Sequence, residues 1–247
     1  MTAARKLLIP FVTAGYPTRT GCRELLKACA AGGADEIELG IPFSDPLADG
    51  PVIQATSQKA LDRGATPEDA FRLAESFRET PLDFMTYVNP ILQYDPRRFF
   101  GRAARAGLRG VIVPDLPPEE ADGLRPAARR AGVPLIFLVS PTCSDERIRR
   151  IARLSERWIY LVSLKGVTGA KLSSDVSSFV RRVRRLTDRP LCVGFGIASP
   201  ADAARAAAEA DGVVVGSALL RLVEAGGKPR DVERFVASLR RALDGRP

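Results

Sequence analysis

The stretch LLIPFVTAGYPTRTGCRELLKACAAGG, residues 7–33, holds the unit from which the rest of the chain is built. Its first seven residues are almost all apolar, which predicts a strand buried on both faces. Thr18 then offers an N-cap for the amphipathic helix that follows. This stretch therefore predicts one strand that leads through a short turn into one helix.

The same pattern recurs along the chain, and Thr66, Ser144 and Ser199 offer caps for later helices. Strict alternation of strands and helices indicates parallel strands with crossover helices, and eight such units in about 250 residues predict a (β/α)8 barrel. A doubly wound open sheet, the alternative, usually carries a glycine fingerprint after its first strand, where this chain has TAGYPT. The eight predicted strands cover residues 7–13, 35–40, 82–88, 110–115, 133–140, 158–163, 190–195 and 212–217.

Composition places the chain among ordinary globular proteins, because 45% of its residues are hydrophobic and 27% are charged. No linker or break in composition divides it, so we expect one α/β domain, a single TIM barrel over residues 1–247. Pro10 interrupts the apolar run near the start, which argues against a secretory signal, and no run is long enough to span a membrane. The four cysteines have the spacing of neither a zinc site nor a disulfide framework, which indicates buried or partly buried thiols in a reducing cytoplasm.

The chain contains no histidine, which excludes histidine-based triads, metal sites and general bases. Acid–base chemistry must therefore use carboxylates, Lys, Tyr or Cys. The net charge of +8 comes with arginine clusters such as RIRRIARL (147–154) and RRVRR (181–185), which fall in helical patterns. Because these clusters are scattered and lack aromatic neighbours, they indicate solvated helix faces and no nucleic-acid site.

The loop ELGIPFSDPLADGP, residues 38–51, follows the second predicted strand and carries two candidate catalytic acids. Alternation along the strand puts Glu38 in the barrel mouth, where partial burial raises the pKa of a carboxyl group and suits it to acid–base work. The alternative for Glu38 is an ion pair with a nearby arginine. Prolines stiffen the loop and hold Asp49 in place, although Asp49 could instead cap the next helix, with Pro51 in its first turn.

Glycine-rich turns at 166–170, 194–200 and 216–220 follow the last three predicted strands. In barrels of this kind phosphate binds to the loops after strands seven and eight, where backbone amides at helix N-termini face the ligand. Lys165, near the end of the sixth strand, raises the possibility of a Schiff-base aldolase, but its parity and the glycines after it favour an ordinary loop lysine. Because no tight carboxylate trio offers a metal site, these residues predict proton transfer on a phosphorylated small molecule, with isomerase, lyase and aldolase all open.

Motifs along nearly the whole chain resemble the tryptophan synthase alpha chain family: FVTAGYP, IELGIPFSDPLADGPVIQ, VPDLP, YLVS followed by GVTGA, GFGI and VVGSAL. The resemblance implies cleavage of indole-3-glycerol phosphate to indole and glyceraldehyde 3-phosphate, a retro-aldol reaction without metal or Schiff base. It implies that Glu38 shuttles protons at ring carbon C3 and the side-chain hydroxyl. Asp49 would stabilise the ring nitrogen and take its proton, so the loop would place a second carboxylate across the indole from the first.

Further roles follow from the same resemblance. Tyr160 would line the site beside Glu38, and Thr168 would lie in a mobile loop that closes over the substrate. The remaining predicted site residues are Phe11, Met85, Ile112, Leu138 and Phe195 for the indole slot, and Gly169, Gly196, Gly216 and Ser217 for the phosphate.

The resemblance also implies a partner. The family's alpha chain docks on a beta chain that carries pyridoxal phosphate, which implies no cofactor in this chain, an alpha–beta–beta–alpha tetramer and passage of indole through a tunnel. Residues 40–58 would form part of the docking surface.

The chain departs from the family pattern in its short leader before Phe11, at Glu36, where an uncharged residue is usual, and at Leu164–Lys165 before GVTG. Glu36 would face the same way as Glu38, and two nearby carboxyl groups raise the pKa of one of them. Three alternatives are a stand-alone lyase that releases indole for a secondary pathway, a Schiff-base aldolase that uses Lys165, and a catalytically quiet barrel that only activates a beta chain.

Overall fold

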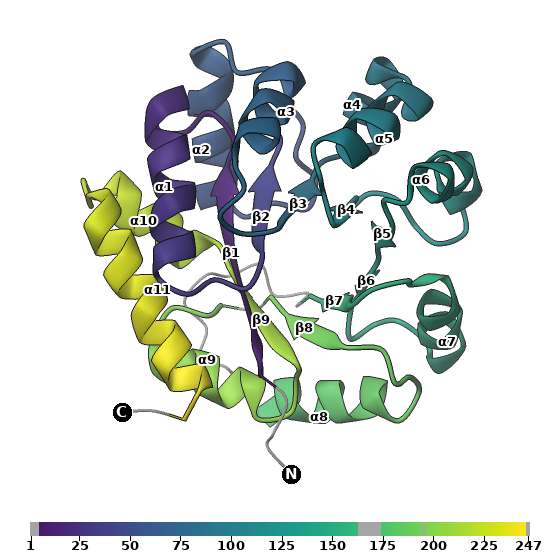
Figure 1. Ribbon diagram of the computed structural model, residues 1–247. Helices are drawn as coiled ribbons and strands as arrows, with labels where there is room; N and C mark the ends of the chain where they lie inside the picture. Colours follow the sequence, from purple (N-terminus) through teal and green to yellow (C-terminus); the bar gives the residue numbers. More distant parts are fainter. Residues whose placement is uncertain (1–4, 163–173, 195, 246–247) are drawn as a thin grey trace.

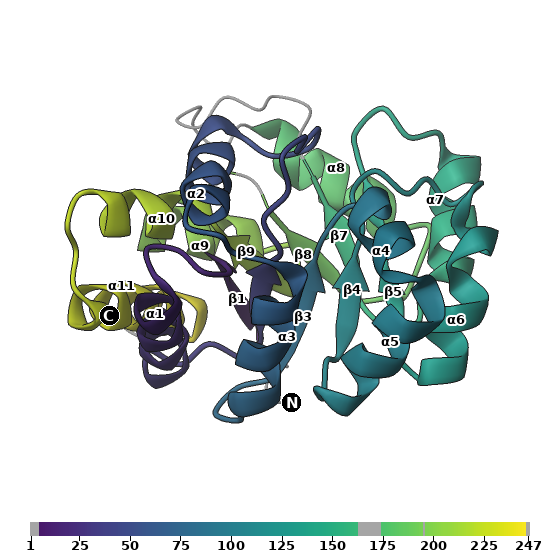
Figure 2. The same cartoon turned by 90° about the horizontal axis from the view of Figure 1, so that it is seen from above.

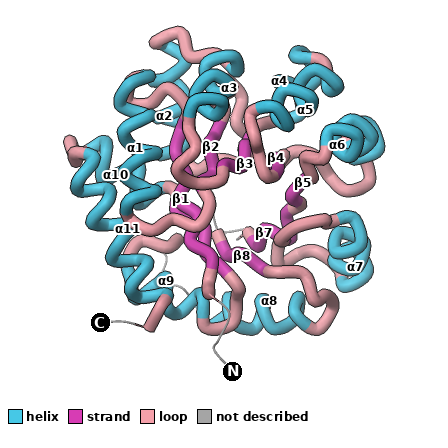
Figure 3. The backbone as a smooth tube through the Cα atoms, viewed as in Figure 1, coloured by secondary structure: helices cyan, strands magenta, loops and turns pink. Residues whose placement is uncertain are grey.

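A ring of parallel strands encloses the centre of the molecule, and helices cover the ring on the outside (Figure 1 and Figure 3). The structure, a computed structural model, describes residues 5–162, 174–194 and 196–245. The near-continuous apolar runs form strands that are buried on both faces, because helices pack on one side and side chains fill the ring on the other. The strands of these residues are β1 (Leu7–Thr13), β2 (Ile37–Gly40), β3 (Leu82–Met85), β4 (Gly110–Ile112), β5 (Leu135–Ile136), β6 (Leu138–Val139), β7 (Ile159–Leu161), β8 (Leu191–Val193) and β9 (Gly212–Val215).

The strands join in the order β5-β4-β3-β2-β1-β9-β8-β7-β6, so that the first strand pairs with the last. The ring closes at Phe137, because β5 pairs with β4 before this residue and β6 pairs with β7 after it. Phe137 itself accepts a hydrogen bond from the Tyr160 amide at 3.0 Å. The predicted (β/α)8 barrel is thus confirmed.

The expectation of one continuous strand over 133–140 is wrong, since this segment forms both β5 and β6. The described residues therefore contain nine strand segments where the sequence predicted eight. The physical reason is the stagger of a closed barrel, in which a tilted strand meets its two neighbours at different heights.

The predicted helix caps are confirmed. Thr18, Thr66, Ser144 and Ser199 each accept a hydrogen bond from the backbone amide three residues further on. Such caps satisfy amides that a helix leaves unpaired at its start. The helices of the described residues are α1 (Arg19–Ala31), α2 (Pro51–Asp62), α3 (Pro67–Ser76), α4 (Val88–Tyr94), α5 (Pro96–Arg105), η1 (Ala121–Gly123, a 3-10 helix), α6 (Arg125–Ala131), α7 (Asp145–Leu154), α8 (Ser174–Arg184), α9 (Pro200–Ala207), α10 (Ser217–Glu224) and α11 (Pro229–Leu243).

Two apolar layers hold the barrel together. The inner layer fills the ring and contains Ile9, Ile112, Trp158, Cys192 and Val214. The outer layer lies between the strands and the helices, and on this side α1 and α11 lie next to each other (Figure 2). The inner layer is a packed core, so any site must lie at an end of the ring.

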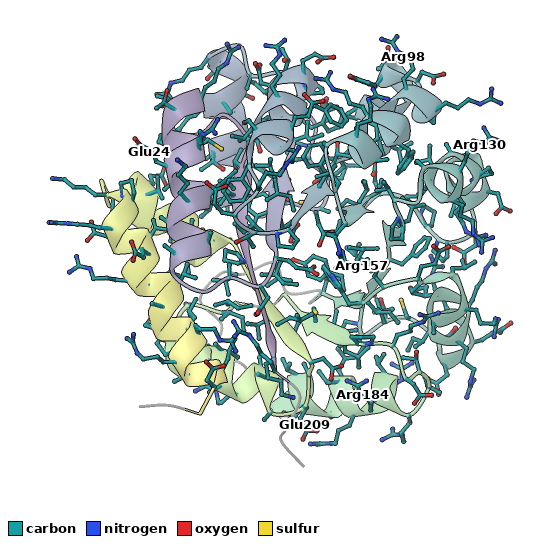
Figure 4. The ribbon with its side chains drawn as sticks, in the orientation of Figure 1. Glu24, Arg98, Arg130, Arg157, Arg184 and Glu209 are labelled. Atoms are coloured by element: carbon teal, nitrogen blue, oxygen red, sulfur yellow. The ribbon has the colours of Figure 1, made fainter. Side chains whose placement is uncertain are left out.

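The arginine-rich helix faces point away from the barrel, as predicted. In α7, Ile148 and Ile151 are buried while Arg149 and Arg150 are exposed. Figure 4 shows Arg98 and Arg130 at the periphery of the molecule, whereas Arg157 reaches into the ring. None of the helices in the described part of the chain combines the length and the apolar character needed to cross a membrane.

Candidate active site

Glu38 stands inside the ring near the carboxyl end of β2. Its neighbours in register are Phe11 on β1 and Asp83 on β3. The side chain is 1% exposed, and its Oε2 atom has no hydrogen-bond partner among the described residues. Burial raises the pKa of Glu38 well above its ordinary value, and the carboxyl groups of Asp83 and Asp49 raise it further. Glu38 is therefore a carboxyl group whose surroundings favour the protonated form, which suits it to give up a proton inside the barrel.

The ion pair considered for Glu38 is found at Glu36 instead. Glu36 faces the ring interior, as expected, and its carboxylate binds the guanidinium of Arg157. Glu36 and Glu38 were expected to raise the pKa of one of the two. The carboxyl groups that raise the pKa of Glu38 are instead those of Asp83 and Asp49.

Asp49 lies in the loop between β2 and α2 and is half-buried. Burial raises the pKa of its carboxyl group to about 6, and a hydrogen bond from the Tyr87 hydroxyl partly offsets this rise. The residue that caps α2 is Gly50, with Pro51 in the first turn, so the alternative role of Asp49 as a helix cap is wrong. Asp49 is thus ionised at neutral pH and directed toward the site.

Tyr87 fixes the position of the Asp49 loop, and sequence reasoning did not single it out. Its ring is 2% exposed and packs against Phe43 with the centroids 5.3 Å apart. Its hydroxyl accepts a hydrogen bond from the Ala48 amide at 3.2 Å, next to Asp49. The available signal was an aromatic residue with a polar tip directly after a strand that ends at the barrel mouth.

Apolar side chains predicted for the indole slot gather inside the ring. Met85, Ile112, Leu138 and Tyr160 belong to one cluster of the inner layer. Phe11 lies across β2 at Gly40, where a Cβ atom would stand 2.5 Å from the Phe11 ring. The absence of a side chain at Gly40 therefore lets the Phe11 ring lie beside Glu38.

Tyr160 lies close enough to the two acids for each to affect it. Burial, followed by the charges of Glu38 and Asp49, raises the pKa of the Tyr160 hydroxyl, which stays neutral. A Cβ atom at Gly194 would stand 2.2 Å from the Tyr160 ring. Gly194, the first glycine of the GFGI motif, therefore admits the tyrosine.

The residues predicted to bind phosphate lie before or at the starts of two helices. Gly196 has a φ of 47°, in the left-handed region that favours glycine, and precedes α9. Gly216 caps α10 and Ser217 is its first residue, so both stand where a helix presents unpaired amides to an anion. The predicted residues Gly169, Thr168 and Phe195, and also Lys165, lie outside the described residues.

A cavity of about 780 Å³ opens between three loops at the carboxyl ends of the strands. Asp49 lines it from the loop after β2, Asp115 from the loop after β4, and Leu138 and Thr142 from β6 and the loop beyond it. Its volume lies in the range of small-molecule sites. Within the described ranges, no group of three or more His, Cys, Asp or Glu residues is placed to hold a metal ion.

Asp83 and Arg157 are two further interior residues that sequence reasoning missed. Asp83 is fully buried, and Arg157 Nη1 donates to its Oδ1 atom at 2.6 Å. The signal for Asp83 was an acid at an inward position of the run LDFM, two residues before Met85. The contact with Arg157 depends on how β3 faces β7 across the ring, which a sequence pattern does not contain.

Comparisons with known proteins find similar sequences and similar folds. Residues 1–244 match the family model described as "Tryptophan synthase alpha chain". The chain is 47% identical to the tryptophan synthase alpha chains of Dehalococcoides mccartyi, with 97% of this chain and 96% of the relative covered, and of Halorhodospira halophila, with 98% and 93% covered. Among solved structures, it is similar to tryptophan synthase subunit alpha from Legionella pneumophila, with a TM-score of 0.90, 38% identity and coverage of 97% and 93%. It is also similar to a chain of tryptophan synthase from Mycobacterium tuberculosis, with a TM-score of 0.92, 35% identity and the same coverage.

Proposed function

This chain belongs to the tryptophan synthase alpha chain family, and we propose that Glu38 and Asp49 are the two acids that carry out its reaction. The enzyme is a lyase of tryptophan biosynthesis that cleaves indole-3-glycerol phosphate to indole and glyceraldehyde 3-phosphate. The observation that carries the assignment of roles is the pair of carboxyl groups at the barrel mouth, both with raised pKa values and each close enough to Tyr160 to affect it.

The carbon–carbon bond can break only when the indole is a good leaving group. Protonated Glu38 gives its proton to ring carbon C3, and the ring nitrogen becomes positive as a result. Glu38, now a carboxylate, takes the proton of the side-chain hydroxyl, whose oxygen becomes the aldehyde of glyceraldehyde 3-phosphate as the bond breaks. Asp49 takes the proton of the positive ring nitrogen before the bond breaks. The bonding electrons then return to the ring, and Asp49 gives the proton back to the nitrogen, so that neutral indole is released.

The two acids have the protonation states that this sequence of steps needs. Burial favours the protonated form of Glu38, since a carboxyl group in low dielectric resists ionisation. Asp49, with a pKa of about 6, is ionised above that pH and can accept a proton. Two carboxyl groups of the same kind thus divide the roles of acid and base through their surroundings.

The substrate fits the inner surface of the mouth. Phe11, the register partner of Glu38, and Met85 and Leu138 of the inner layer offer apolar contacts to the indole ring. The starts of α9 and α10, with Gly196, Gly216 and Ser217, offer amides and a hydroxyl to the phosphate. We assign the same role to Gly169, a further indole contact to Phe195 and loop closure to Thr168, on the resemblance of their motifs alone.

The partner that fits the expected docking surface, residues 40–58, is a tryptophan synthase beta chain. Leu47, in the loop before α2, is 85% exposed, which suits an apolar contact with another subunit. We propose an alpha–beta–beta–alpha tetramer in the cytoplasm, with pyridoxal phosphate bound only by the beta chain. Indole released here would pass to that chain.

Release of glyceraldehyde 3-phosphate from indole-3-glycerol phosphate tests the function. Slow turnover by the purified chain, strong acceleration by an added beta chain and loss of turnover in Glu38→Gln are expected. Asp45→Asn is the matched control for turnover by the purified chain without a beta chain, because Asp45 is an exposed acid of the same loop and is held by Ser44. Absence of turnover with and without a beta chain would overturn the assignment.

The comparisons do not favour the alternatives. Fast turnover without a beta chain would indicate a stand-alone lyase. Acceleration of a beta chain without cleavage would indicate a catalytically quiet barrel.

A further inference from the structure

Three charged side chains meet inside the ring beneath Glu38, toward the amino ends of the strands. Glu36 stands just before β2, Asp83 on β3 and Arg157 just before β7. Arg157 binds both acids, through Nη2 to Glu36 and through Nη1 to Asp83 at 2.6 Å. Trp158 Nε1 donates to the other oxygen of Glu36 at 3.3 Å. We call Glu36, Asp83 and Arg157 the floor triad.

The floor triad has more carboxyl groups than cations. The side chains are 11% exposed at Glu36, 0% at Asp83 and 16% at Arg157, so water screens the charges poorly. Burial raises the pKa of Asp83 well above its ordinary value, Arg157 lowers it and Glu36 raises it again. One guanidinium therefore cannot hold both acids fully ionised without leaving a net negative charge in the ring.

Asp83 connects the floor triad to the catalytic acid. Glu38 and Asp83 are direct partners in the register of β2 and β3, so their side chains stand next to each other on the inner face. Glu38 Oε2 and Asp83 Oδ2 are both buried and have no hydrogen-bond partner among the described residues. Because interacting carboxyl groups titrate as a set, a charge on Asp83 opposes a charge on Glu38.

The other ionisable groups around Glu38 do not replace Asp83 in this role. Asp49 faces it from the loop after β2 and is already assigned to the ring nitrogen. Tyr160 from β7 and Cys192 from β8 have raised pKa values and carry no charge at neutral pH. Glu36 is turned to Arg157 and Trp158.

We propose that Asp83, anchored by Arg157, is a positioning residue that keeps the Glu38 carboxyl protonated until it meets the substrate. This inference rests on the proposed role of Glu38. Arg157 contributes by holding Asp83 in register with Glu38. Glu36 contributes by binding the other nitrogen of the same guanidinium, which fixes Arg157 against Asp83.

The test is the pH profile of kcat/KM in Asp83→Asn, which removes the charge and retains the shape. Activity falls at high pH as Glu38 loses its proton, and this alkaline limb should move to lower pH by about one unit. Arg157 and Glu36 remain as a balanced pair, so the variant should fold. The matched control is Glu36→Gln, which removes the same charge from the same triad, and its alkaline limb should not move to lower pH. An unmoved limb in Asp83→Asn, or equal downward shifts in both variants, would overturn the proposal.

A second measurement is independent of turnover. Carbon-13 labelling of glutamate carboxyl groups allows the Glu38 titration to be followed by NMR without substrate, with Glu38→Gln used to assign the signal. The midpoint of the Glu38 titration should fall to lower pH in Asp83→Asn. It should also fall in Asp83→Leu, which removes the same charge and places an apolar side chain in the buried strand. A wild-type enzyme that fails to cleave the substrate would overturn the proposed function, whereas an unchanged Glu38 midpoint would overturn the role of Asp83.

Discussion

Glu36 and Glu38 stand two residues apart on the same strand segment and face the same interior, yet their surroundings differ completely. Glu36, at the floor of the barrel, binds Arg157 and receives a hydrogen bond from Trp158. Glu38, at the mouth, is buried, and one of its carboxyl oxygens has no partner in the part of the chain that the structure describes. The comparison shows that the presence of a facing cation decides whether a buried acid holds the fold together or stays available for chemistry.

The same contrast applies to the loops. Asp49, near the mouth, receives a hydrogen bond from a neutral tyrosine and keeps a pKa of about 6. Asp35, before β2, binds Arg5 and Arg240 at 2.7 Å each. Asp35, which meets two arginines, is structural, whereas Asp49 meets a neutral donor and Glu38 Oε2 meets no donor among the described residues.

Removing the acid at the mouth should have the largest effect. Glu38→Gln should lower kcat/KM by about 10³- to 10⁴-fold, because both proton transfers of the shuttle are lost. The raised pKa of Glu38 means that its contribution to stability is complete below its ordinary pKa and is lost as pH rises through the folded value. The variant should therefore be as stable as wild type or more so at about pH 8, which urea unfolding measures. A clearly less stable variant would contradict the view that Glu38 is held for chemistry and not for stability.

Removing the cation at the floor should affect stability first. Arg157→Met leaves Glu36 and Asp83 buried without a counterion and should reduce the free energy of unfolding by about 3–5 kcal/mol. Adding Glu36→Gln and Asp83→Asn should recover most of this loss, since no uncompensated charge remains. Arg149→Met, at an exposed arginine of α7, is the control and should change stability by less than about 0.5 kcal/mol. If the triple variant does not regain the free energy of unfolding, the loss in Arg157→Met does not come from the unpaired charges.

Asp49→Asn sharpens the comparison at the mouth. It should lower kcat/KM by about 10²-fold, because the ring nitrogen loses its proton acceptor. In the wild type, activity should fall as pH drops through about 6, where Asp49 becomes protonated. The substrate phosphate also titrates at about pH 6. The variant should therefore lose the contribution of Asp49 to this acid limb and retain only that of the phosphate. Identical acid limbs in both proteins would exclude a required ionisation of Asp49.

The smallest expected effect is at the neutral donor. Tyr87→Phe removes the hydroxyl that lowers the pKa of Asp49. The acid limb of the pH profile should therefore move to higher pH by about half a unit. Tyr94→Phe serves as the control, because the Tyr94 hydroxyl binds Glu68 away from the mouth. Equal profiles for both variants and wild type would mean that Tyr87 acts on the loop only through packing.

The sequence predicted the barrel because each strand and helix carries its own local signals. Thr18 and Ser199 cap helices where expected, and the apolar runs are the strands. The division of 133–140 into β5 and β6 was not predictable, since it depends on which neighbour each half of the strand pairs with. Local patterns identify elements, whereas closure depends on the stagger of the whole ring.

The interior of the site was predicted less evenly. Strand parity placed Glu38 correctly, because side-chain alternation is a local property. The same parity applied to Asp83, but an acid within an apolar run has no assigned role until its neighbours are known. Arg157 lies 74 residues from Asp83 along the chain, so their contact appears only in the folded ring.

The pairing of β1 with β9 has a consequence for the chain as it is made. Lys6 Nζ donates to the Ala210 carbonyl, 204 residues further along, at 2.7 Å. At ribosomal rates of about 5–20 residues per second, the first strand waits roughly 10–40 s for its last neighbour to emerge. During that time one edge of β1 is open to pairing with other nascent chains. The late-translated strand β9 therefore removes an aggregation hazard that β1 creates, and a chaperone that covers an open strand edge would act in that interval.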